Sequence, residues 1–233
     1  MPIAREGQFL VTTKWNKPHL GLESSMIDAC IQEAINKPYA GVFGSPTFGF
    51  REKTLDSLRS IPQLEEIWFW DVELDDVEAV YTLKRLRSFG VQPGRPPIDF
   101  SQIPTLERLV VTYRAGDSGV DRLKNLHRLS LWHYSPKKRL FGEILLPDGL
   151  TELEINWANP KALDGLTPLL SLRRLEIHRC RNLESLSVLP RLFPNLEHLV
   201  VAACGKVSVD EGRRAVENLP KLKHAHVQKT KLV

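Results

Sequence analysis

The sequence has no run that approaches 18 consecutive apolar residues, so we expect no membrane-spanning helix. Its first residues, MPIAREGQFLVTT, lack the apolar core of a secretory signal peptide. Cysteine is scarce, with 3 among 233 residues, and without a signal this favours a reducing compartment. The net charge of +4 is small, and acidic and basic residues are interleaved through most of the chain. These absences predict a cytoplasmic protein whose partner is neither a membrane nor a nucleic acid.

Motifs of common catalytic sites are also missing. There is no G-x-S-x-G, no phosphate-binding G-x-x-x-x-G-K-[ST], no H-E-x-x-H and no C-x-x-C. We therefore expect neither enzymatic activity nor a cofactor. What the chain does have is an ordinary balance of 42% hydrophobic and 26% charged residues, sufficient for one large domain or two small ones.

A repeat organises most of the chain. Eight segments begin with Leu and have a second apolar residue three positions later. These segments start at Leu64, Leu83, Leu106, Leu126, Leu150, Leu172, Leu196 and Leu222. The starts are 19, 23, 20, 24, 22, 24 and 26 residues apart, and all but the first spacing lie in the range of about 20–29 residues that is typical of leucine-rich repeats.

From about residue 55 to the end, this L-x-x-L-x-L pattern resembles the leucine-rich-repeat family. Two copies carry the family's Asn/Cys position eight residues after the first Leu, as Cys180 and Cys204, and we expect both to be buried thiols. The other copies have Val72, Val91, Arg114, Tyr134, Ala158 and Thr230 there, which predicts an irregular solenoid without an asparagine ladder. The resemblance implies an α/β fold: a right-handed solenoid with a concave parallel β-sheet and with short helices and loops on the convex side.

The N-terminal part has a different pattern. We expect residues 1–45 to form a cap within the same domain as residues 46–233, which supply about eight or nine rungs. Inside the cap, the sequence predicts a strand over 7–15 and a helix over 24–38 with one apolar stripe.

Two capping boxes mark expected helix starts. Ser25 and Asp28 form one at the start of the cap helix. Ser208 and Glu211 form the other, at the start of a helical return segment over 208–219.

Side chains alternate between the two faces of a strand, so the second and third apolar residues of each repeat point into the core. In LEEIWFW this buries Ile67 and Phe69 and directs Glu66, Trp68 and Trp70 to the concave face. The other outward positions are Arg85, Arg87, Arg108, Val110, Thr112, Arg128, Ser130, Trp132, Glu152, Glu154, Asn156, Arg174, Glu176, His178, His198, Val200, Ala202, His224, His226 and Gln228. The expected face is thus rich in Trp and Arg at first, acidic in the middle, and rich in His at the end.

The repeat LKRLRSF fits this scheme least well. It places Ser88 in a core position and Phe89 outside. A β-bulge that turns Phe89 inward is the alternative.

The predicted function is non-enzymatic protein binding by the concave face, because Trp and Arg are enriched at protein interfaces. The predicted partner-binding residues are Trp68, Trp70, Arg85, Arg87, Arg108, Arg128, Trp132, Glu154 and His178. The chain looks like the small stand-alone leucine-rich-repeat proteins of bacteria, and this resemblance implies a role as an inhibitor or an immunity protein.

Alternatives remain for the same residues. Trp68 and Trp70 could instead pack beneath the N-terminal cap, and the arginines could form a solvated ladder that keeps the sheet soluble. Another class of function is an enzyme or a metal-dependent regulator that uses His198, His224 and His226. A metal site would need a further ligand at a fixed spacing, and none is evident, so we expect no metal ligands.

Overall fold

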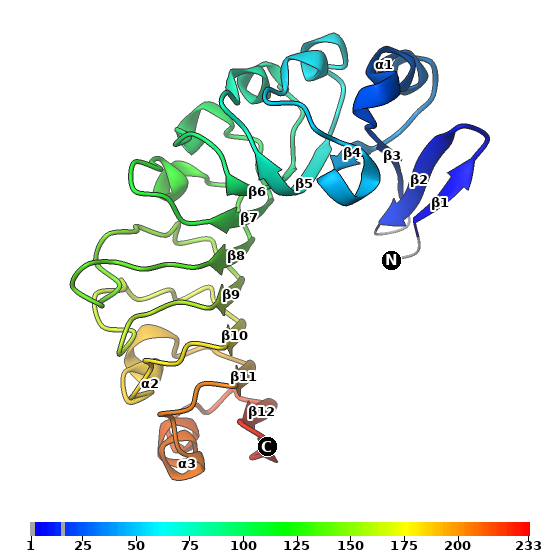
Figure 1. The fold of residues 1–233 in the computed structure, drawn as a ribbon. Helices are drawn as coiled ribbons and strands as arrows, with labels where there is room; N and C mark the ends of the chain where they lie inside the picture. The colour runs from blue at the N-terminus through cyan, green and yellow to red at the C-terminus, as the bar shows by residue number, and fades with distance from the viewer. Residues whose placement is uncertain (1–2, 15–16) are drawn as a thin grey trace. The chain divides into compact units, whose positions relative to one another are not determined.

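The computed structural model describes residues 3–14 and 17–233 (Figure 1). By its internal packing the chain divides into two compact units, unit 1 with residues 1–111 and unit 2 with residues 112–233. Both are built from short, mostly parallel strands with few and short helices, which makes the fold α/β. Among the described residues, no helix combines the length and the apolar character that crossing a bilayer requires.

The strands of unit 1 pair in chain order. They are β1 (Ile3–Glu6), β2 (Phe9–Lys14), β3 (Lys17–Gly21), β4 (Gly41–Gly44), β5 (Glu66–Glu73), β6 (Ser88–Gly94) and β7 (Arg108–Thr112), whose last residue already belongs to unit 2. β1, β2 and β3 pair antiparallel, and β3 to β7 pair parallel. The strand predicted over 7–15 corresponds to β2, and its last residue, Trp15, lies outside the described residues. The sequence did not predict β1 and β3, which flank β2.

Unit 1 has one α-helix, α1, and its other described helical segments are short 3-10 helices. The helical segments follow in chain order. They are η1 (Ser24–Met26), α1 (Ile27–Asn36), η2 (Pro46–Phe48), η3 (Asp56–Ser60), η4 (Glu78–Thr82) and η5 (Phe100–Gln102). The predicted capping box of Ser25 and Asp28 is wrong, because η1 precedes α1 and the N-cap of α1 makes no side-chain hydrogen bond. The neighbouring Ser24 Oγ instead accepts a hydrogen bond from the Arg51 backbone N–H at 2.7 Å, a long-range tie that no local pattern encodes.

Unit 2 repeats one strand and one return segment. Its elements are η6 (Val120–Arg122), β8 (Arg128–Trp132), β9 (Glu152–Asn156), β10 (Arg174–His178), α2 (Leu189–Leu192), β11 (His198–Ala202), α3 (Val209–Glu217), β12 (His224–Val227) and β13 (Thr230–Lys231). β8 to β12 pair parallel in chain order, and β13 pairs antiparallel with β12. Figure 1 shows α2, α3 and the return loops on one side of these strands.

The core lies between the strands and the return segments. Ile67 and Phe69 of β5 are buried, as are Leu153 and Ile155 of β9 and the equivalent residues of the other unit 2 strands. These positions confirm the predicted alternation. We call the opposite side of the strands the outward face.

The predicted start of the second repeat, at Leu83, is wrong. Glu66 pairs with Ser88 and Ser88 with Arg108, so the repeat begins at Leu86 and not at Leu83. Phe89 is then a core residue, with none of its surface exposed. No bulge is needed to bury it, because the pairing is regular from Glu66 to Phe69.

This shift also corrects the placement of two arginines. Arg85 and Arg87 precede β6, so they do not lie on its outward face. Ser88 and Gly90 take the outward positions of that strand.

Candidate functional site

The two indoles of β5 alternate with Ile67 and Phe69 and are half-buried. Trp70 stacks on Phe43 of β4, with ring centroids 6.1 Å apart and an interplanar angle of 18°. It also meets Phe48 of η2 edge-on, at 5.8 Å between centroids. Trp70 thus packs against a residue of the predicted cap, in line with the alternative interpretation of this side chain.

Trp68 lies against the next strand. It pairs in register with Gly90 of β6, and a Cβ built at Gly90 would overlap the six-membered ring of Trp68. The missing side chain of Gly90 therefore leaves the room that the indole occupies. Because Trp68 is only partly buried, some of its surface can contact a partner.

Glu66, predicted to face outward, lies in a buried ionic cluster. Its Oε2 is 3.2 Å from His19 Nε2, and its Oε1 accepts a hydrogen bond from Arg108 Nη2 at 3.1 Å. The side chains of His19, Glu66 and Arg108 are 1%, 4% and 25% exposed. Gly41 allows this approach, because a Cβ there would lie 2.7 Å from the His19 ring. Arg108 is therefore anchored to a buried carboxylate.

Arg85 and Arg87 are exposed and alternate with carboxylates. Arg85 pairs with Glu65 at 3.5 Å, and Arg87 pairs with Glu107 at 3.3 Å. Glu65 also accepts a hydrogen bond from Lys17, which lowers the pKa of this carboxyl. The positive charge of these two predicted arginines is thus partly neutralised by carboxylates of the same chain.

In unit 2, the predicted residues of β8 lie where alternation places them. Trp132 is half-buried and donates a hydrogen bond from Nε1 to Ser130 Oγ at 2.9 Å. Arg128 is exposed and pairs with Glu152 of β9 at 3.5 Å. The hydrogen bond to Ser130 holds the indole in one orientation without a partner.

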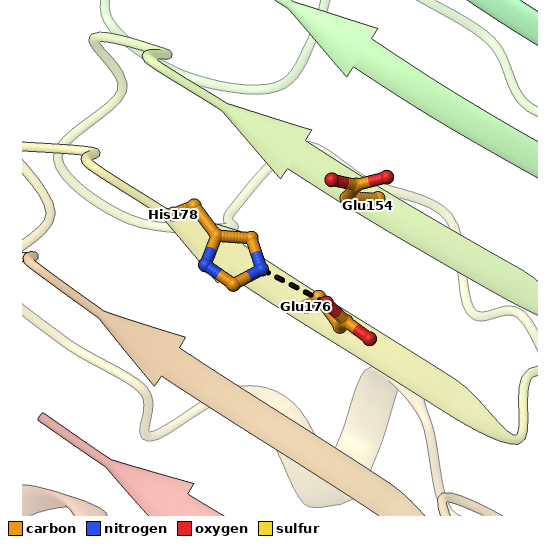
Figure 2. Close-up of side chains that lie close together, drawn as sticks. All are labelled: Glu154, Glu176 and His178. Atoms are coloured by element: carbon orange, nitrogen blue, oxygen red, sulfur yellow. Dashed lines mark hydrogen bonds and ion pairs between the residues drawn. The ribbon is translucent and has the colours of Figure 1, made fainter. Parts of the chain in front are cut away.

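Two further predicted residues, Glu154 and His178, meet Glu176 on the outward face of β9 and β10 (Figure 2). One ligand atom from each of the three lies within 4.8 Å of the others. His178 Nε2 is 2.9 Å from Glu176 Oε2, and Arg174 Nε donates to Glu176 Oε1 at 2.7 Å. Partial burial opposes ionisation of Glu176, but the hydrogen bonds from His178 and Arg174 outweigh it and lower the pKa of this carboxyl.

The histidines of the last strands form a separate stack. The rings of His198 and His224 are 5.7 Å apart, and those of His224 and His226 are 5.4 Å apart. Partial desolvation, together with the neighbouring imidazoles, lowers the pKa of His224. Within the described part of the chain, the only three-residue set with metal-ligand geometry is the one around Glu176, and these histidines do not belong to it.

Sequence reasoning missed an exposed ring stack at the strand ends of unit 2. The Trp157 ring stacks on that of His133, with centroids 6.2 Å apart, and Arg179 Cζ lies 4.8 Å from its centre. All three residues have left-handed backbones, with φ of 53–57°. Each follows directly after its strand, seven residues beyond the first Leu of its repeat, and counting this position along the repeats could have found them.

No protein-family model matches the sequence, and no curated protein matches it.

Proposed function

We propose that the chain is a non-enzymatic protein-binding module of the cytoplasm, built from leucine-rich-repeat rungs. Partly exposed indoles on the outward face carry this proposal, Trp68 in unit 1 and Trp132 in unit 2. Tryptophan is among the residues most often found as interface hot spots, and its truncation there can cost about 2 kcal/mol or more. The resemblance to small stand-alone bacterial proteins favours an inhibitor or an immunity protein as the specific role.

The geometry ranks the predicted binding residues. Trp132 is the best anchor, because its orientation is fixed by Ser130 while part of its surface stays free. Arg128 is exposed and can exchange its ion pair with Glu152 for a partner's carboxylate at little cost. Trp70 and Arg108 contribute mainly to packing and to the buried cluster.

Affinity capture from a lysate of the producing organism tests the proposal. We expect Trp132→Ala to lose at least 10-fold in affinity for a partner that the wild-type chain captures. Leu170→Ala is the matched control, because Leu170 is 60% exposed and lies in a return segment outside the strands.

Thermal unfolding of both variants accompanies the capture. Equal affinity of wild-type and Trp132→Ala for every captured protein contradicts the anchor role. If Trp132→Ala unfolds at a lower temperature than Leu170→Ala, Trp132 contributes to packing and not to binding.

A further inference from the structure

We infer that Glu154, Glu176 and His178 bind one divalent transition-metal ion on the outward face of unit 2, a site that goes beyond the proposed protein binding. Glu154 of β9 and Glu176 of β10 are partners in the parallel register. His178 lies two residues after Glu176 and therefore on the same face. The three side chains converge from neighbouring strands in Figure 2, with one donor atom from each within 4.8 Å of the others.

The first argument is the charge balance. Like charges directly opposite each other on neighbouring strands destabilise a sheet. Arg174 compensates Glu176 through a 2.7 Å hydrogen bond, whereas Glu154 accepts a hydrogen bond from the uncharged amide of Asn156 at 2.9 Å. Across the described residues, Glu154 forms no ion pair. A bound cation between the two carboxylates would remove this repulsion.

The second argument is that neighbouring side chains already orient the donors. Asn156 holds Glu154 Oε1 and leaves its Oε2 for an ion, whereas Arg174 holds Glu176 Oε1 and His178 Nε2 contacts Glu176 Oε2 at 2.9 Å. Asn156 is buried, with 5% of its surface exposed, so its amide is fixed by the packing around it. Such partners behind the ligands orient them and raise metal affinity. His178 Nε2 would exchange its contact with Glu176 for the metal.

The third argument is space. A hollow of about 150 Å³ on the same face is lined by Glu154 and Glu176, together with Glu152 and the guanidinium side chains of Arg128 and Arg174. His178 is not part of this lining, so the ion would lie where the hollow meets the imidazole. The hollow offers room for an ion with water, or with a group from a partner, in the remaining coordination positions. An imidazole with two carboxylates favours zinc or another transition metal, because magnesium and calcium prefer oxygen ligands alone.

Isothermal titration of the full-length chain with zinc chloride tests the site, with magnesium chloride in a parallel titration. We expect saturable binding of one zinc ion per chain. Glu154→Gln and His178→Gln should each weaken this binding at least 10-fold.

Two variants serve as controls. Glu184→Gln removes one negative charge from an exposed carboxylate that pairs with Lys161 and Lys206, and it should bind zinc as the wild type does. His198→Gln removes an imidazole of the separate histidine stack, and it too should bind zinc unchanged.

Three results would overturn the inference. One is the lack of saturable zinc binding by the wild-type chain. Another is equal affinity in wild type, Glu154→Gln and His178→Gln, with circular dichroism showing all three folded. The last is loss of binding in His198→Gln alone, which would place the ion at the histidine stack.

Discussion

At the scale of single residues, burial decides what a charge contributes. Glu65 and Glu66 are adjacent in sequence, yet their side chains are 24% and 4% exposed. Glu65 meets the flexible ends of Lys17 and Arg85 in solvent, where an ion pair contributes little. Glu66 lies between His19 and Arg108, so its removal leaves buried polar groups without their partner.

This difference gives a prediction. Glu66→Ala should lower the free energy of unfolding by about 3 kcal/mol, because it uncouples a buried cluster. Glu65→Ala should lower it by less than about 1 kcal/mol. Urea denaturation followed by tryptophan fluorescence measures both changes. Equal and small losses would show that the buried cluster adds no stability.

At the scale of elements, α3 shows how one return segment is fixed to the preceding one. Ser208 Oγ accepts a hydrogen bond from the Glu211 backbone N–H at 3.0 Å, which confirms half of the predicted capping box. The Glu211 carboxylate does not complete the box. It accepts hydrogen bonds from the Leu186 backbone N–H at 2.9 Å and from Ser185 Oγ at 3.0 Å.

The Leu186 N–H is the main reason why the pKa of Glu211 is lowered from the ordinary value of 4.5. A carboxyl whose folded-state pKa is depressed stabilises the fold above its unfolded-state pKa and loses this contribution as the pH falls through the folded-state value. The stability difference between wild type and Glu211→Gln should therefore be full at neutral pH and disappear in acid. Denaturant unfolding between pH 7 and pH 2 measures it.

Glu217→Gln provides the control for this pH series, because Glu217 is exposed at the end of the same helix. The free energy of unfolding of Glu217→Gln should follow that of the wild type at every pH. A wild-type advantage over Glu211→Gln that stays constant into acid would exclude the proposed contact as its source.

At the scale of the whole molecule, the three cysteines report on the integrity of the core. Cys30, Cys180 and Cys204 are free thiols, and at most 2% of any of them is exposed. A hydrogen bond with Cys204, together with burial, raises the pKa of the Cys180 thiol. The same hydrogen bond lowers the pKa of Cys204, but burial keeps reagents away from all three thiols and should make them inert in the native state.

We therefore expect titration with 5,5′-dithiobis(2-nitrobenzoic acid) to detect no fast-reacting thiol in the native chain. After denaturation in guanidinium, all three should react. A thiol that reacts fully within seconds in native buffer would contradict the burial of these side chains.

Much of the fold follows from short-range patterns. The L-x-x-L spacing located the strands of unit 2, and alternation identified their buried residues, because both depend on neighbours within one strand. The error at Leu83 arose because Leu83 and Leu86 both begin an L-x-x-[LF] segment. Only the pairing of Ser88 with Glu66 and with Arg108 shows that the repeat begins at Leu86.

The candidate sites were less predictable. Alternation named Glu154 and His178, but their meeting with Glu176 depends on side-chain orientation across two strands. It also placed Glu66 on the outward face, and could not foresee that His19, far away in sequence, would cover it there. Trp157 was overlooked because it lies one residue beyond its strand.

The sequence by itself determined the period of the repeat and the side of the strand on which each residue lies, since these are properties of a chain with a two-residue alternation. Tertiary structure decided which outward side chains are exposed, paired or brought together. Residues opposite each other on parallel strands of this protein are more than 19 positions apart, as Ser88 and Arg108 are. Their meeting is set by strand register and packing, which no short stretch of sequence contains.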